Sequence, residues 1–139
     1  NAAFGLLQLK HIDHAMARRR EIAEQYRRLL AGVKGIQVVD GAGQSEANFS
    51  YFPILVNADY PLDRDALYQR LKDNNIFGRR YFYPLISNFS MYSGMTSAQR
   101  NNLPVANQVA EKVLCLPIYP ALTTESVEKI AGIIRNAHV

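Results

Sequence analysis

The sequence is poor in the features that define several large classes of protein. Its 139 residues include a single cysteine, Cys115, which excludes an internal disulfide framework and a cysteine-rich metal site. No apolar run reaches the roughly 20 residues that span a bilayer, and no apolar signal-peptide core follows a basic N-terminus. We therefore expect a cytoplasmic globular chain of one-domain length, without a membrane partner.

The motifs of common catalytic sites are also missing. There is no glycine-rich phosphate loop, zinc-ligand spacing or nucleophile elbow. His11 and His14 are close in the chain, but a metal site usually needs a third convergent donor, so we interpret them as a solvated helix face and predict no metal. Cys115 lies between Leu114 and Leu116, a pattern typical of a buried, unreactive thiol.

Positive charge is in mild excess, with sixteen Lys and Arg against twelve Asp and Glu and a net charge of +4. A positive net charge is compatible with a phosphate or nucleic-acid partner. The arginines form two clusters, Arg18–Arg20 with Arg27 and Arg28, and Arg79 with Arg80. Glu21 and Glu24 partly neutralise the positive charge of the first cluster. We therefore interpret Arg18–Arg20 as a solvated helix flank with ion pairs between neighbouring turns.

Hydrophobic periodicity and capping residues predict the helices. Residues 2–31 show helical spacing, in one long helix or two in series, and Gly32 and Gly35 end it. Further helices are expected after Asp63 and Thr123, which are good N-cap residues, and from Pro104, which suits a first turn.

Runs of β-branched and aromatic residues predict four strands, at 36–39, 49–56, 76–83 and 113–116. Pro53 favours an edge position or a bulge for the second strand. Loops are expected at 41–48 and 85–103. The resulting fold class is α+β, a small, mostly antiparallel sheet covered by helices.

The segment Gly78–Leu85 places two arginines beside three aromatic rings. Arginine forks suit bidentate phosphate binding, and aromatic faces suit stacking on a base or sugar. In a strand, alternation would put Arg80, Phe82 and Pro84 on one face and Arg79, Tyr81 and Tyr83 on the other. The aromatics could simply be core, or one face could form a basic aromatic site, as in a stand-alone nucleotide- or RNA-binding module.

Motifs in order along essentially the whole chain resemble one family. They are NAAFGLLQLK at 1–10, ARRREIAE at 17–24, RRYFYPL at 79–85, LPVA at 103–106, VLCLPIYP at 113–120 and LTTESV at 122–127. The set is similar to the small domain of the DegT/DnrJ/EryC1/StrS aminotransferases. These are pyridoxal-phosphate enzymes that aminate keto groups on nucleotide-linked sugars.

The resemblance implies a fold-type I small (C-terminal) domain at 36–139, with 1–35 a long helix connecting it to a missing large domain. For the intact enzyme it implies pyridoxal 5′-phosphate, a nucleotide-linked keto sugar, L-glutamate as amino donor and a homodimer, without nucleic acid. No lysine matches the family's Schiff-base motif, among Lys10, Lys34, Lys72, Lys112 and Lys129. We therefore expect this fragment alone to contain no catalytic residue, bind no cofactor and be inactive.

The resemblance also assigns three substrate-binding residues, Arg79, Arg80 and Tyr81. Arg79 aligns with an arginine that precedes a histidine-tyrosine-proline stretch in the family. Tyr81 replaces a histidine found in many members. The Tyr-Phe-Tyr-Pro sequence is more similar to the branch that acts on thymidine-diphosphate 4-keto-6-deoxy sugars, so a dTDP-linked substrate is expected.

Overall fold

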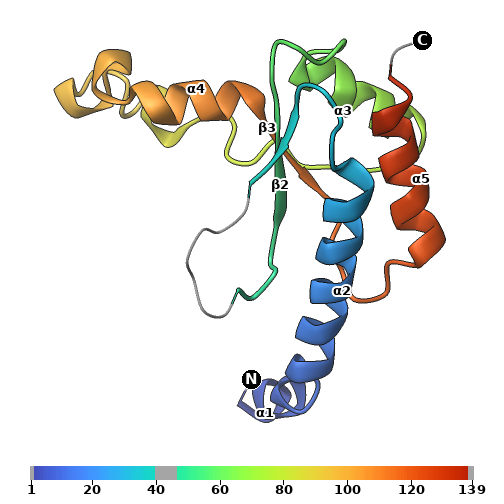
Figure 1. Ribbon diagram of the computed structural model, residues 1–139. Coiled ribbons are helices and arrows are strands. Elements are labelled where there is room, and N and C mark those ends of the chain that lie inside the picture. Colours follow the sequence, from blue (N-terminus) through green and yellow to red (C-terminus); the bar gives the residue numbers. More distant parts are fainter. Residues whose placement is uncertain (1, 40–46, 138–139) are drawn as a thin grey trace.

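The computed structural model describes residues 2–39 and 47–137 (Figure 1). Part of the loop predicted at 41–48 lies outside these residues. In chain order the elements are α1 (Ala2–Leu9), α2 (Ile12–Leu30), β1 (Ile36–Val38), β2 (Phe52–Val56), α3 (Arg64–Asp73), α4 (Pro104–Lys112), β3 (Val113–Leu116) and α5 (Thr124–Arg135). Short 3₁₀ turns at Ile86–Asn88, Thr96–Ala98 and Arg100–Asn102 interrupt the predicted 85–103 loop.

The predicted helices are confirmed, and the first region is two helices in series. Asp63 caps α3, where its Oδ1 accepts the Ala66 N–H at 2.7 Å. Thr123 caps α5 through the Ser126 N–H at 3.2 Å. After α2, Gly35 has a φ of 78°, and a Cβ there would lie 2.2 Å from the Tyr60 backbone nitrogen. These local signals fix the helix ends.

The three strands form one antiparallel sheet in the order β1-β2-β3, with Ile36 opposite Val56 and Phe52 opposite Leu116. α2 and α5 pack against each other and cover one face of this sheet (Figure 1). The core between the layers is apolar and fully buried, including Tyr26, Ile54, Leu114, Val127 and Ile134. The predicted α+β class with an antiparallel sheet is confirmed.

The edge position predicted from Pro53 is wrong, because β2 is the central strand. The Pro53 carbonyl accepts the Val39 N–H at 3.1 Å, so its backbone polar groups face β1 and not β3. β1 ends at Val38, one residue before that contact. The missing proline N–H therefore lies where the pairing of β2 with β1 ends. Its absence removes at most one backbone hydrogen bond at the end of that pairing.

The strand predicted at 76–83 is also wrong. Arg79 pairs with Cys115 in an isolated antiparallel bridge, and residues 80–84 are not in a strand. The side chains of this segment contact α3 instead, as described below. The two-face alternation expected for Arg79 to Pro84 therefore does not apply.

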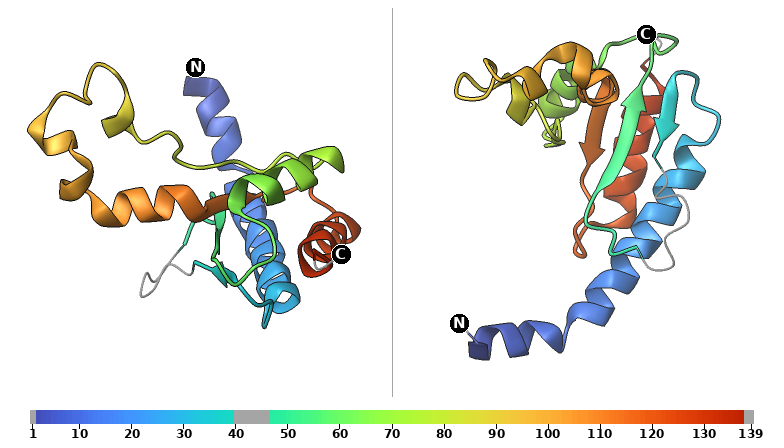
Figure 2. Two further views of the ribbon diagram at one scale, coloured as in Figure 1. Left: turned by 90° about the horizontal axis from the view of Figure 1, so that it is seen from above. Right: turned by 90° about the vertical axis from the view of Figure 1, so that its left-hand side faces the viewer.

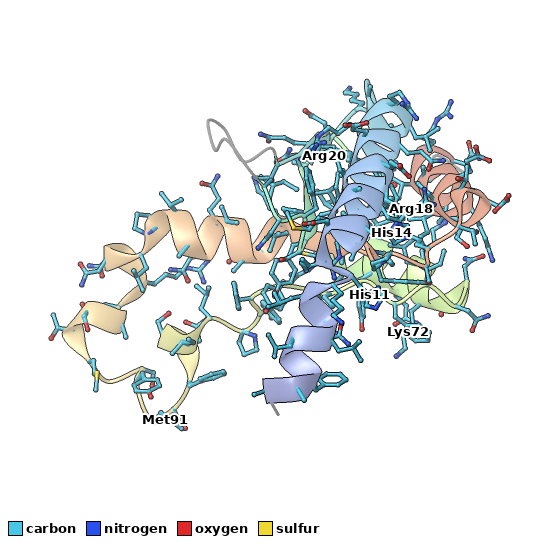
Figure 3. The ribbon with its side chains drawn as sticks, turned by 90° about the horizontal axis from the view of Figure 1, so that it is seen from below. His11, His14, Arg18, Arg20, Lys72 and Met91 are labelled. Atoms are coloured by element: carbon cyan, nitrogen blue, oxygen red, sulfur yellow. The ribbon has the colours of Figure 1, made fainter. Side chains whose placement is uncertain are left out.

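Two parts project from the layered body. α1 extends α2 beyond the sheet, and the 86–112 arm, formed by the 3₁₀ turns and α4, leaves the body at the opposite end (Figure 2). Met91 lies on the outer part of this arm, far from the body (Figure 3). No helix in the described part of the chain is long and apolar enough to cross a membrane.

Candidate substrate-binding site

Arg79 is placed by a backbone bridge to β3. Its N–H donates to the Cys115 carbonyl at 2.9 Å, and the Cys115 N–H donates back at 2.8 Å. Gly78 permits this approach, because a Cβ there would lie 3.2 Å from the Cys115 carbonyl oxygen and 3.3 Å from Leu114. The bridge therefore fixes the backbone from which the Arg79 side chain extends.

A crevice of about 560 Å³ lies beside this bridge, between the end of β3, the end of α3 and the helices α2 and α5. Three cationic side chains and four hydroxyl-bearing side chains line it, from Arg19, Arg79, Lys129, Ser50, Tyr51, Tyr119 and Ser126. Within the described residues its lining contains no Asp or Glu side chain. An opening with this charge balance favours an anionic ligand.

Tyr81 lies next to Arg79 and pairs with Tyr51. Their hydroxyl groups are 2.8 Å apart and their ring centroids 4.6 Å apart. The hydrogen bond to Tyr51 is the main cause of a raised pKa for the Tyr81 phenol. Because Tyr51 itself lines the crevice, the pair brings Tyr81 to its edge.

Arg80, in contrast, is directed to α3. Its Nη1 donates to Asp65 Oδ1 at 2.9 Å, and its guanidinium lies over the rings of Tyr68 and Tyr83. Arg80 does not belong to the crevice lining. Of the three residues predicted to bind substrate, the structure thus places Arg79 in the crevice lining and Tyr81 against the lining residue Tyr51, and it directs Arg80 to α3.

Sequence reasoning missed Arg19 and Tyr51. Arg19 was interpreted as part of a solvated flank, yet its side chain is half-buried, and Nε is buried without a hydrogen-bond partner in the described residues. Arg18 is also half-buried and donates to the Leu122 carbonyl at 2.9 Å. The predicted solvation therefore holds only for Arg20, which is exposed over Phe49. An ion pair between neighbouring turns is present, between Arg18 Nη1 and Glu21 Oε2 at 2.8 Å. The missed contacts join distant segments, which no local pattern reveals.

The remaining candidate groups offer no separate chemistry. Cys115 is buried, as predicted, and burial raises the pKa of its thiol to about 11. His11 and His14 are exposed near the start of α2 (Figure 3). Across residues 2–39 and 47–137, no three His, Cys, Asp or Glu side chains gather as metal ligands would.

The lysines do not fit a cofactor-holding role. Lys10, Lys34, Lys72 and Lys129 are exposed. Lys112 is half-buried and donates to Asn57 Oδ1 at 3.4 Å. A lysine that binds pyridoxal phosphate needs an amine that is desolvated or otherwise activated. None of the five lysines has such a setting in the described structure.

The sequence profile of the DegT/DnrJ/EryC1/StrS aminotransferase family matches residues 1–135. The chain is 52% identical over 134 residues to the dTDP-4-amino-4,6-dideoxy-D-glucose transaminase of Escherichia coli, covering 96% of this chain and 36% of that protein. It is 46% identical over 136 residues to the Shigella dysenteriae protein of the same name, and the match covers 98% of this chain and 36% of that protein. The chain therefore spans just over a third of the length of these relatives.

Solved structures show the same fold. The crystal structure of DesI in the presence of its TDP-sugar product superposes with a TM-score of 0.88 at 27% identity, covering 96% of this chain and 34% of that chain. The crystal structure of the aminotransferase TlmJ from Streptoalloteichus hindustanus superposes with a TM-score of 0.83 at 30% identity, covering 96% of this chain and 34% of that chain. The fold class expected from the sequence is therefore confirmed.

Proposed function

Because the chain belongs to the DegT/DnrJ/EryC1/StrS aminotransferase family, we propose that the intact protein containing it transfers an amino group to a keto group of a nucleotide-linked sugar. The proposed substrate is a dTDP-linked 4-keto-6-deoxy sugar, and the proposed donor is L-glutamate. The 52% identity to a dTDP-amino-sugar transaminase supports the dTDP-linked class.

The observation that carries this proposal within the chain itself is the crevice beside Arg79. Its three cationic side chains, without a carboxylate in the described lining, suit the diphosphate of a nucleotide sugar. Whichever of the Tyr51 and Tyr81 hydroxyl groups accepts in their mutual hydrogen bond keeps its own O–H free to donate to a sugar or phosphate oxygen at the edge of the crevice. In this proposal Arg79 and Tyr81 bind and orient the substrate.

Pyridoxal 5′-phosphate, the cofactor of this family, supplies the electron sink for amino-group transfer when bound. The lysines of this chain do not fit the role of holding it, as described above. We therefore place the cofactor site, the catalytic lysine and the catalytic steps in residues outside these 139. The chain alone is then expected to be inactive.

We further propose that residues 1–35 connect the small domain, residues 36–139, to the large domain of a homodimeric enzyme. α1 contains no buried residue in the described structure. Large apolar side chains on it are exposed, with Phe4 at 67% and Leu9 at 66%. Apolar surface of this kind is typical of a contact with another part of a protein.

The proposal is tested by a transamination assay of the intact protein. The protein is incubated with a dTDP-linked 4-keto-6-deoxy sugar, L-glutamate and pyridoxal phosphate, and the product is identified by mass spectrometry. We expect a dTDP-amino sugar that does not form when glutamate is omitted. UDP- and GDP-linked keto sugars test the nucleotide preference. No amine from any of these substrates, together with tight RNA binding by the protein, would support the binding-module alternative.

A further inference from the structure

Two arginines meet one carboxylate in the first turn of α3. Arg64 Nε lies 2.8 Å from Asp65 Oδ1, and Arg80 Nη1 lies 2.9 Å from the same oxygen. Asp65 is therefore the point at which the segment after Arg79 is attached to α3. Charged pairs that share an oxygen in this way form a small network, and they hold geometry better than an isolated surface pair.

Tyr83 completes this cluster. Its ring centroid is 4.6 Å from the Arg64 guanidinium carbon and 5.4 Å from that of Arg80. The ring centroid of Tyr68, on α3, lies 4.8 Å from the Arg80 guanidinium carbon. Cation–π contacts at these distances stabilise the stacked arrangement. The chain between Arg80 and Tyr83 is thus attached to α3 at both positions.

Arg64 ties the cluster to the strand that holds Arg79. It is a buried charged residue, 4% exposed, and its Nη1 donates to the Ala110 carbonyl at 2.9 Å. It also reaches the Val113 carbonyl, at the start of β3, at 3.5 Å. The same strand contains Cys115, whose backbone pairs with Arg79. Segment 79–83 is therefore fixed by β3 at one end and by the α3 cluster at the other.

We propose that Asp65, Arg80 and Tyr83 are positioning residues that hold segment 79–83 so that Arg79 lines the crevice and Tyr81 stays in contact with the lining residue Tyr51. Arg80 acts through its neighbours and does not bind substrate. This inference rests on the proposed function for its catalytic consequence, but the holding of the segment is independent of any substrate. It revises the substrate-binding role predicted for Arg80 from the sequence.

The holding of the segment is tested by amide hydrogen exchange in the intact protein. In Arg80→Ala and Asp65→Asn variants we expect exchange at the Arg79 N–H to rise about three- to tenfold, since each variant removes ion-pair and stacking contacts. Arg80→Lys keeps the charge but loses the planar fork, so it is expected to restore only part of the protection. Asp73→Asn, on the same helix, is the matched control, because Asp73 accepts a hydrogen bond from Gln69 of the same helix and takes no part in the Arg80 cluster. Unchanged exchange in Arg80→Ala would overturn the proposal.

Steady-state kinetics tests whether Arg80 acts through Arg79 and Tyr81. Arg80→Ala is expected to raise KM for the keto sugar about three- to tenfold in the otherwise native enzyme. It should have no further effect in an Arg79→Ala/Tyr81→Phe background, where nothing remains to be positioned. An undiminished effect in that background would show that Arg80 itself binds substrate. If Arg79→Ala alone leaves KM unchanged, the proposed site is wrong, while the exchange experiment still decides whether the cluster holds the segment.

Discussion

At the scale of single residues, the chemistry of each candidate group depends on its neighbours more than on its type. Arg79 and Arg80 are adjacent in sequence, yet one lines a crevice and the other pairs with Asp65. The sequence identified both arginines and Tyr81, because basic and aromatic residues together are a visible pattern. It could not separate their roles, since Asp65 and Tyr51 lie 15 and 30 residues away in the chain.

Cys115 should react slowly with thiol reagents. Burial raises the pKa of its thiol to about 11 from an ordinary value of 9.0, although the charge of Arg79 opposes this. The reactive thiolate is therefore expected to be about a hundredfold scarcer at pH 8 than in the unfolded chain. Labelling rates with a thiol-disulfide reagent, measured with and without urea, check this. Equal rates in the two conditions would contradict it.

Asp65 should make stability depend on pH in the acid range. Burial acts to raise the pKa of this carboxyl, but hydrogen bonds and charges from Arg80 and Arg64 outweigh it and lower the pKa. The carboxylate therefore stabilises the fold above its unfolded-state pKa, and this contribution is lost as pH falls through the lower folded-state pKa. Urea midpoints measured from pH 7 to pH 3 should fall less steeply for Asp65→Asn than for the native chain. Identical slopes would argue against the network.

At the scale of elements, helices were predictable and strand pairing was not. Asp63, Thr123, Pro104 and the glycines after α2 act within a few residues of their own position, so their signals are local. A strand needs a partner, and the aromatic run at 76–83 finds one only at Cys115. Beyond Arg79 the segment makes side-chain contacts with α3 and does not pair with a strand. No local periodicity in the sequence could reveal these contacts.

Gly35 should be far less tolerant of a side chain than Gly32. Both have positive φ angles, of 78° and 76°, so alanine is strained at either position. At Gly35 the new Cβ would also meet the Tyr60 backbone at 2.2 Å, whereas at Gly32 nothing lies within 4 Å. Gly32→Ala is expected to cost about 1 kcal/mol, and Gly35→Ala at least about 2 kcal/mol. Urea denaturation of both variants measures the difference, and equal losses would refute the role of the close approach.

At the scale of the whole molecule, the layered body presents one cationic crevice and two projecting parts. The described lining of the crevice has three cationic side chains and no carboxylate, so its local charge is positive and suits a substrate phosphate. α1 and the 86–112 arm project from the layered body at its two ends (Figure 2). Their exposed apolar residues include Leu6, Ile86, Met91 and Val105. This architecture agrees with a small domain that supplies one wall of a larger enzyme's site.

The central claim is that this wall binds a nucleotide-linked sugar through Arg79. The most direct test is the KM of the intact enzyme for its keto-sugar substrate after Arg79→Ala, with Arg28→Ala as control. Arg28 is exposed in the last turn of α2 and does not line the crevice. Loss of a charge-assisted hydrogen bond should raise KM about ten- to a hundredfold, with kcat changed much less. A KM that stays at the native value in Arg79→Ala would contradict the account.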